Sequence, residues 1–174
     1  ELDTGTWQAR LPAPSLHGPH QQANMALAVA ALVTVMPDLP AAALAAGVTN
    51  ASWPGRLQML PEGPLGLLAG RPVWVDGAHN AHGADALTAA LPALDDRKWH
   101  FICGALDTRP ADEFLQRIAR LAASITCVAI PDQPASLPAS DLAQAARKSF
   151  PAARIASSVA GALQALAAGP DDAG

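Results

Sequence analysis

The feature that most constrains the fold is the segment of residues 72–87, where an apolar, β-prone run changes abruptly into an alanine-rich one. A Val-Trp-Val run leads into Asp76, and Leu87, Leu91 and Leu94 follow at helical spacing. This pattern predicts a buried strand, a short turn and a helix. Asp76 would then lie at the carboxyl end of a strand, the edge where ligands bind in open α/β sheets.

The predicted turn carries a carboxylate (Asp76), an imidazole (His79) and an amide (Asn80) within five residues. A helix beginning near Asn80 would point its free N–H groups and the positive end of its dipole toward the same edge. Asp and Asn are also ordinary turn and N-cap residues. The turn alone therefore fits either a ligand site or simple capping.

Strands and helices alternate through the rest of the chain. Strands are predicted over residues 57–60, 73–76, 99–104, 125–130 and 153–156. Helices are predicted over residues 81–91, 110–122, 139–149 and 159–168. The strands before Asp76 and Gly104 are not polar-alternating, as expected for strands buried on both faces. This alternation predicts an α/β fold, Rossmann-like, with a mostly parallel sheet and helices on both faces.

The first part of the chain predicts a different arrangement. A short strand is expected within residues 6–11. A short helix is expected over residues 39–46, and it should end at Gly47. Between them, residues 21–36 predict a helix with one apolar stripe, formed by Met25, Ala28, Leu32 and Val35. An irregular linker follows the second helix.

Composition excludes several classes of protein. The net charge is −4 and the eleven basic residues are scattered, so a nucleic-acid partner is not expected. No apolar run approaches the ~20 residues needed to span a bilayer, and no signal peptide is visible, so we expect no membrane partner and a cytoplasmic location. Cys103 and Cys127 fall in predicted strands and fit free buried thiols, with a disulfide between neighbouring strands as the alternative.

Three short motifs, taken together, carry a family resemblance. They are Gly-Pro-His-Gln-Gln-Ala-Asn at residues 18–24, Trp-Pro-Gly-Arg at 53–56 and Asp-Gly-Ala-His-Asn at 76–80. In this order and spacing they resemble the C-terminal portion of the folylpolyglutamate synthase/dihydrofolate synthase family, part of the Mur ligase superfamily. That family has a proline after the last motif, where this chain has Ala81.

The resemblance implies a domain organisation and an activity. Residues 1–46 would end a central ATP-binding domain, 47–56 would form a linker, and 57–174 would form the C-terminal Rossmann-like ligase domain. The activity implied is that of an ATP-dependent amide ligase, which adds L-glutamate to dihydropteroate or folate through an acyl phosphate. The cofactors implied are ATP and Mg²⁺, and the resemblance also implies a monomer.

The chain contains no Gly-x-x-x-x-Gly-Lys-Ser/Thr motif. The phosphate-binding loop and the magnesium ligands are therefore expected in a preceding N-terminal part of the same protein, and no metal ligand is expected here. The chain begins with Glu1 rather than Met, which also suggests a fragment or a processed chain.

The resemblance assigns roles residue by residue. Asn24, Arg56 and Asp76 match residues that contact ATP, and His79 is the candidate catalytic residue, in contact with the nucleotide or the incoming glutamate. His20 and Gln21 are supporting candidates. Taken singly, these residue types equally fit a surface Asn, a solvent-exposed Arg and a histidine bonded within its own turn.

Two alternatives remain open at this point. The chain could be a non-catalytic α/β module that binds a nucleotide or a protein, or a Mur-type ligase acting on a peptidoglycan precursor. No Gly-x-Gly-x-x-Gly or Gly-x-Ser-x-Gly pattern is present, which disfavours a dinucleotide enzyme and a serine hydrolase.

Overall fold

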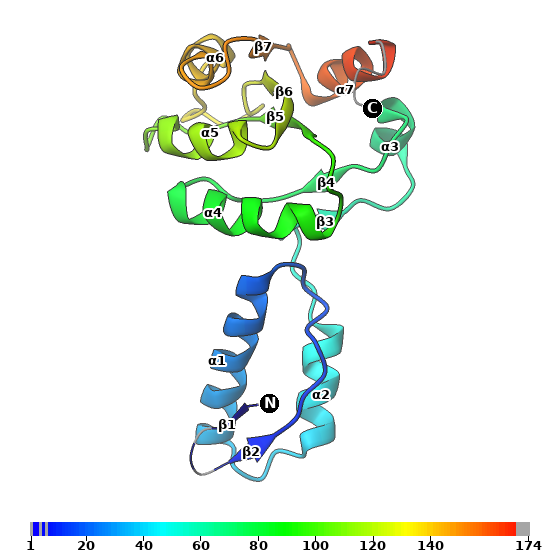
Figure 1. Cartoon of the computed structure of the whole chain (residues 1–174), viewed down its shortest axis with the longest axis vertical. Coiled ribbons are helices and arrows are strands. Elements are labelled where there is room, and N and C mark those ends of the chain that lie inside the picture. The colour runs from blue at the N-terminus through cyan, green and yellow to red at the C-terminus, as the bar shows by residue number, and fades with distance from the viewer. Residues whose placement is uncertain (1, 4, 6, 170–174) are drawn as a thin grey trace. The chain divides into compact units, whose positions relative to one another are not determined.

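The computed structural model describes residues 2–3, 5 and 7–169. The chain divides into two compact units, Glu1–Gln58 and Met59–Gly174 (Figure 1). Each unit has its own arrangement of elements, and each is described by itself.

Two helices dominate the first unit. The strands β1 (Leu2–Asp3) and β2 (Gln8–Ala9) pair antiparallel, and the helices α1 (Pro19–Val35) and α2 (Ala41–Asn50) follow. Helix α1 begins after Gly18, whose φ of 105° lies in the region that favours glycine. Pro19 suits the first helical position because its fixed φ is already helical and the N–H it lacks would have no partner there.

The core of the first unit lies between α1 and α2. It is formed by Val29 and Val33 of α1 with Leu44 and Val48 of α2. The predicted stripe on α1 was therefore wrong, because Val35 is 79% exposed and Leu32 is 43% exposed. Several faces of this alanine-rich helix carry apolar residues, so the facing helix, rather than the pattern, selects which one is buried.

Helix α2 does not end at Gly47, as the sequence predicted, but continues to Asn50. Val48 lies one turn after Leu44 and is 6% exposed. Glycine in a helix interior costs roughly 1 kcal/mol relative to alanine, whereas burying a valine side chain is worth about 1.5–3 kcal/mol. Packing of Val48 therefore outweighs the tendency of Gly47 to end the helix.

The second unit alternates strands and helices much as predicted. In chain order its elements are β3 (Gln58–Met59), α3 (Pro64–Ala69), β4 (Trp74–Val75), α4 (Ala81–Ala90), the 3₁₀ turn η1 (Leu91–Ala93), β5 (Trp99–Cys103), α5 (Asp112–Ala119), β6 (Ala122–Cys127), α6 (Ala139–Arg147), β7 (Arg154–Ile155) and α7 (Val159–Ala168). Helix α7 has the predicted bounds. Helix α3 was not predicted, because its six residues are too few to show a periodic pattern.

The strands β5, β6 and β7 form a parallel three-stranded sheet in that order, which confirms the predicted α/β class. Strands β3 and β4 form a separate pair. Helix α5 packs beside both α4 and α6, while α3 packs against α7 (Figure 1). Ile118 of α5, Ile125 of β6 and Leu142 of α6 are almost fully buried and form part of the core of this unit.

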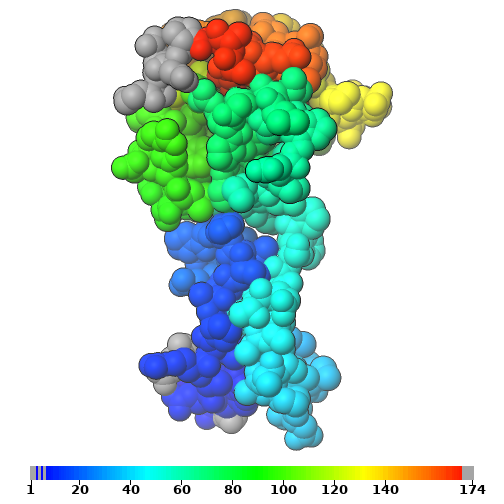
Figure 2. All heavy atoms as spheres, turned by 90° about the vertical axis from the view of Figure 1, so that its right-hand side faces the viewer, coloured from blue at the N-terminus to red at the C-terminus, as the bar shows by residue number. Residues whose placement is uncertain are grey.

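Strand β6 begins three residues earlier and ends three residues earlier than predicted. After Cys127 the chain leaves the ladder, and the backbone N–H of Ile130 donates to the Ser136 hydroxyl at 2.8 Å. The following loop stands out from the surface of this unit (yellow in Figure 2). Among the described residues, no helix is long and apolar enough to cross a membrane.

Candidate functional site

A pocket in the first unit brings together two of the predicted site residues. It has a volume of about 600 Å³ and lies between α1, α2 and the segment of residues 51–56. Most of its lining is aliphatic, but Gln21, Asn24 and Arg56 contribute amide and guanidinium groups. Asn24 and Arg56 are 32 residues apart in the sequence. Because both line one pocket, a single ligand bound there can touch both side chains.

The tight turn before Arg56 fixes where this residue leaves the linker. Gly55 has a φ of 72°, and its N–H donates to the Gln58 side chain at 2.9 Å. The N–H of Arg56 donates to the Trp53 carbonyl at 3.3 Å, and the next residue, Leu57, is 3% exposed. The backbone is therefore anchored on both sides of Arg56, while its side chain remains exposed.

A chain of polar contacts runs along the first turns of α1. The Asn24 amide donates to Gln21 Oε1 at 3.2 Å, and Gln21 Nε2 lies 3.1 Å from His20 Nε2. Gln21 is 7% exposed, unusual for a glutamine. These contacts place His20 and Gln21 directly behind Asn24, so a supporting position for both fits the geometry.

In the second unit, the predicted order of strand, turn and helix around Asp76 is confirmed, but the prediction that this strand is buried on both faces was wrong, because Val75 is 40% exposed. Strand β4 ends at Val75 and α4 begins at Ala81. Asp76 Oδ1 accepts the N–H of Ala78 at 2.7 Å, and the His79 ring bonds the Gly77 carbonyl through Nδ1 at 2.8 Å. Because a carbonyl only accepts, Nδ1 carries the proton, which leaves the Nε2 lone pair of the exposed His79 ring available to a ligand.

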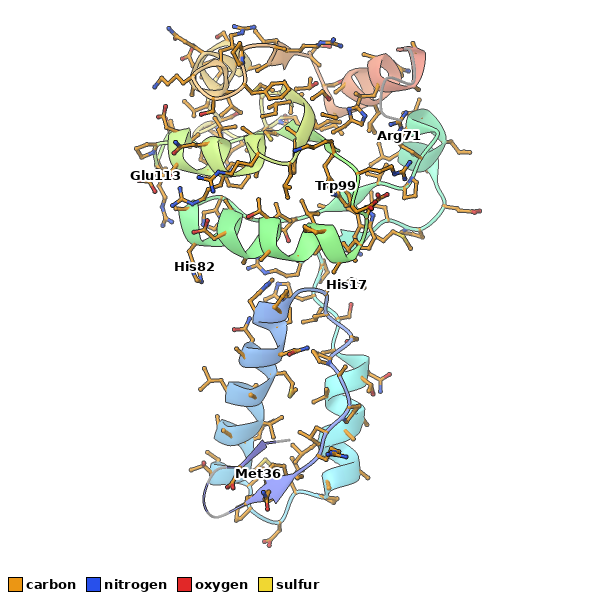
Figure 3. The ribbon with its side chains drawn as sticks, in the orientation of Figure 1. His17, Met36, Arg71, His82, Trp99 and Glu113 are labelled. Carbon is orange, nitrogen blue, oxygen red and sulfur yellow. The ribbon has the colours of Figure 1, made fainter. Side chains whose placement is uncertain are left out.

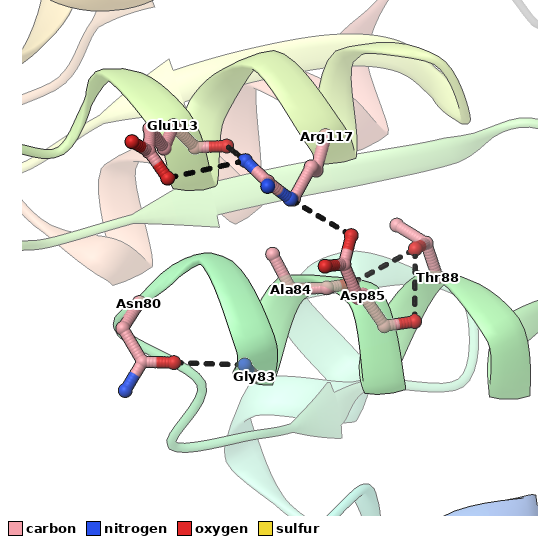
Figure 4. Close-up of polar contacts among 7 residues, drawn as sticks. All are labelled: Asn80, Gly83, Ala84, Asp85, Thr88, Glu113 and Arg117. Carbon is pink, nitrogen blue, oxygen red and sulfur yellow. Dashed lines mark hydrogen bonds and ion pairs between the residues drawn. The ribbon is translucent and has the colours of Figure 1, made fainter.

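Asn80 is a capping residue. Its Oδ1 accepts the N–H of Gly83 at 2.8 Å, which satisfies one of the free donors at the start of α4 (Figure 4). The capping interpretation is therefore confirmed for Asn80. For Asp76, the bond to Ala78 shows a structural role, which leaves a ligand role open.

The cap of α4 predicts a measurable effect on stability. Asn80→Ala should lower the free energy of unfolding by about 1 kcal/mol, because the Gly83 N–H loses its acceptor. Urea unfolding of the purified chain would measure this. His82→Ala is the matched control, since His82 is exposed and points away from the same helix turn (Figure 3). An equal shift in both variants would contradict the assigned cap.

An ion pair that no sequence pattern predicted joins α4 to α5. Arg117 donates to Asp85 Oδ1 at 2.8 Å and to the Glu113 carbonyl at 2.9 Å, and its guanidinium lies 3.6 Å from the Glu113 carboxylate (Figure 4). Partly exposed pairs of this kind contribute little stability, typically below about 1 kcal/mol. The pair therefore orients the two helices more than it stabilises them.

Helix α5, which follows the loop that carries Arg109, begins later than predicted. Its first residue is Asp112, two residues after the predicted start, and Ala111 occupies its N-cap position without a side-chain cap. The backbone of residues 105–107 instead bonds residues 135–137: Asp107 N–H donates to the Ala135 carbonyl, and Leu137 N–H to the Ala105 carbonyl, both at 2.8 Å. This pairing of two distant loops delays the start of the helix.

The cysteines are free, as the first of the two sequence interpretations predicted. Cys103 and Cys127 are direct partners in the parallel pair β5–β6. Burial raises the pKa of the Cys103 thiol to about 12, and the neighbouring Cys127 adds to this rise. Burial likewise raises the pKa of the Cys127 thiol.

These raised pKa values predict poor thiol reactivity. The thiolate is the reacting form, so at pH 8 the folded chain should react with iodoacetamide far more slowly than a free cysteine does. Both thiols should react at the ordinary rate in denaturant. Mass spectrometry of the alkylated protein would measure both rates, and rapid modification of the folded chain would contradict the assignment.

Within residues 2–3, 5 and 7–169, no three His, Cys, Asp or Glu side chains lie close enough together to hold a metal ion. Asn24 and Arg56 belong to the first unit, whereas Asp76 and His79 belong to the second. The residues present therefore offer a pocket with amide and guanidinium groups, and separately a turn with a carboxylate and an imidazole.

Comparison with known proteins finds a family model and similar proteins of one kind. Residues 55–173 match the family model "Mur ligase, glutamate ligase domain". A probable bifunctional folylpolyglutamate synthase/dihydropteroate synthase of Haloferax volcanii is 31% identical over 129 residues, which is 74% of this chain and 14% of that protein.

Two solved structures show the same fold. Mycobacterium tuberculosis folylpolyglutamate synthase complexed with ADP has a TM-score of 0.77 and 27% identity, covering 88% of this chain and 34% of that one. A Yersinia pestis bifunctional folylpolyglutamate synthase/dihydrofolate synthase, complexed with AMPPNP and a Mn ion, has a TM-score of 0.71 and 26% identity, covering 96% and 37%. The chain thus spans well under half the length of each of these three proteins, and the matches confirm the resemblance carried by the three motifs.

Proposed function

Since this chain belongs to the glutamate ligase domain family of the Mur ligases, we propose that it is the C-terminal part of an ATP-dependent ligase that joins L-glutamate to dihydropteroate or folate. Residues 1–46 then end the central ATP-binding domain, 47–56 form the linker, and 57–174 form the C-terminal ligase domain. The single observation that supports this most strongly is the pocket shared by Asn24 and Arg56. Two of the three predicted ATP-binding residues line this pocket, which supports the proposal that one nucleotide contacts both.

The proposed reaction has two steps. A carboxylate oxygen of dihydropteroate or of a folate glutamyl group attacks the γ-phosphorus of ATP, so that an acyl phosphate forms and ADP leaves. The amine of L-glutamate then attacks the acyl carbon, inorganic phosphate leaves, and the amine gives up a proton. Both steps shift negative charge among phosphate oxygens, so a fixed cation near them stabilises the transition state.

Each predicted site residue has a task in this scheme. The Arg56 guanidinium pairs with the phosphates, which its planar donors suit well. Asp76 accepts hydrogen bonds from the nucleotide, as acidic residues at strand ends do in nucleotide-binding folds. His79, with its Nε2 lone pair available, contacts the nucleotide or accepts a hydrogen bond from the glutamate amine. Asn24 binds the nucleobase, because it lines the mostly aliphatic pocket with a side chain that can both donate and accept hydrogen bonds.

A divalent cation such as Mg²⁺ supplies charge neutralisation on the ATP phosphates in this chemistry. Its ligands are proposed in the preceding part of the protein, together with the phosphate-binding loop. The proposed partners are that N-terminal part and the small-molecule substrates: ATP, L-glutamate, and dihydropteroate or folate. Closing of the C-terminal domain over ATP would position glutamate and exclude water.

The proposed function predicts that ADP release depends on the presence of both other substrates. The full-length protein, supplied with ATP and Mg²⁺, should release ADP only when both L-glutamate and dihydropteroate or a folate are present. Mass spectrometry should show a product extended by one glutamyl residue. D-glutamate serves as the control. ADP release that needs a peptidoglycan precursor instead would indicate another Mur-type ligase, and no glutamate-dependent release would favour a non-catalytic module.

A further inference from the structure

The Gln21 side chain, which is hydrogen-bonded to Asn24, determines which atom Asn24 can offer to a ligand. The Asn24 Nδ2 amide donates to Gln21 Oε1 at 3.2 Å. Among the described residues, the other end of the amide, Oδ1, has no hydrogen-bonding partner, and Asn24 lines the pocket. As long as this bond holds, Asn24 presents an acceptor to the pocket.

The orientation of Gln21 is fixed in turn by His20. Gln21 Nε2 lies 3.1 Å from His20 Nε2. Gln21 Oε1 already accepts from Asn24, so Nε2 is the end that faces the ring and can only donate. His20 Nε2 must then be the acceptor, and the ring proton sits on Nδ1. That buried Nδ1 has no partner among the described residues, so the contact with Gln21 alone assigns the tautomer.

Reversing Asn24 would disturb all three residues. If Asn24 turned its amide round, two oxygens would face each other between Asn24 and Gln21. Gln21 could follow only if the His20 ring also changed to its other tautomer, with the proton on Nε2. Since Gln21 is 7% exposed, water cannot readily replace the lost bonds, and unsatisfied buried polar groups are costly.

We propose that Gln21, held by His20, is a positioning residue that makes the pocket selective for a purine with an amino group at C6. Adenine offers such a donor to Asn24 Oδ1. Hypoxanthine and guanine carry an exocyclic oxygen at the same place, which would face Oδ1 without a hydrogen between them. This inference rests on the proposed function, because it requires that Asn24 binds the nucleobase of ATP.

The test compares ATP with inosine triphosphate (ITP), which differs from ATP by this one exocyclic group. For the full-length enzyme, kcat/KM for ATP should exceed that for ITP by about 10- to 100-fold, as expected for loss of a directed base contact. Gln21→Leu removes the acceptor that holds Asn24, so this ratio should fall by about fivefold or more. The ratio within one variant does not depend on how much of the protein is folded.

Two further variants sharpen the result. Gln22→Leu is the matched control, since Gln22 is the next residue on α1 and is exposed; it should leave the ratio unchanged. Gln21→Glu keeps an acceptor for the Asn24 amide, with the His20 ring in its other tautomer, and should retain most of the selectivity.

The outcomes separate the two proposals. If Asn24→Ala leaves kcat/KM for ATP unchanged, the proposed role of Asn24 fails, and this inference fails with it. If Asn24→Ala lowers kcat/KM for ATP but Gln21→Leu keeps the wild-type ATP/ITP ratio, the positioning role of Gln21 alone is overturned.

Discussion

Arg56→Ala in the full-length protein should lower kcat by about 10²- to 10³-fold, the usual effect of removing one group that stabilises charge in a transition state. Arg56 lines the same pocket as Asn24, and its guanidinium would neutralise charge as the γ-phosphate moves to the carboxylate. Steady-state ADP release, coupled to glutamate addition, would measure the loss.

The structure provides the controls for this variant. The Arg56 side chain is exposed, so its removal should leave the unfolding transition nearly unchanged. Arg10→Ala removes an exposed arginine of the same unit that does not line the pocket and should retain activity. Arg56→Lys keeps the charge but loses the planar pair of donors, so it should recover only part of the rate. Wild-type kcat in Arg56→Ala would favour the non-catalytic module.

The second large effect concerns the chain by itself. A purified protein of residues 1–174 should show no detectable ligase activity, because the sequence contains no Gly-rich loop ending in Lys-Ser/Thr to hold the ATP phosphates. The chain should nevertheless fold, since each of its two units has its own buried residues. Circular dichroism would establish folding, and the ADP-release assay would establish inactivity. Glutamate addition by this chain alone would contradict the proposal that the phosphate-binding loop lies in the preceding part of the protein.

Local sequence patterns predicted the second unit well. The turn after Val75, the start of α4 and both ends of α7 followed from residues close in sequence. Caps, helical spacing and β-prone runs act over a few residues, so they can be recognised without knowing the fold.

The errors arose where distant residues decide the outcome. The buried face of α1 is selected by Leu44 and Val48 of the next helix. The start of α5 depends on bonds between two loops about thirty residues apart, such as Asp107 to Ala135. No local pattern contains these contacts, which form only when the tertiary structure does.

The candidate site was likewise predicted only in part, because its residues could be identified from the sequence but their contacts could not. The three motifs indicated Asn24, Arg56, Asp76 and His79, but only the structure shows that Asn24 and Arg56 line one pocket. The sequence also marked His20 and Gln21 without giving them a task. Their contact distances supplied one, because hydrogen-bond direction depends on which atoms face each other.

The most direct measurement is a crystal structure of the full-length protein with a non-hydrolysable ATP analogue and Mg²⁺. The account predicts the base in the pocket against Asn24, the Arg56 guanidinium within hydrogen-bonding distance of a phosphate oxygen, and the Asp76 carboxylate bonded to the same nucleotide. A nucleotide that touches neither Asn24 nor Arg56 would contradict the proposed site.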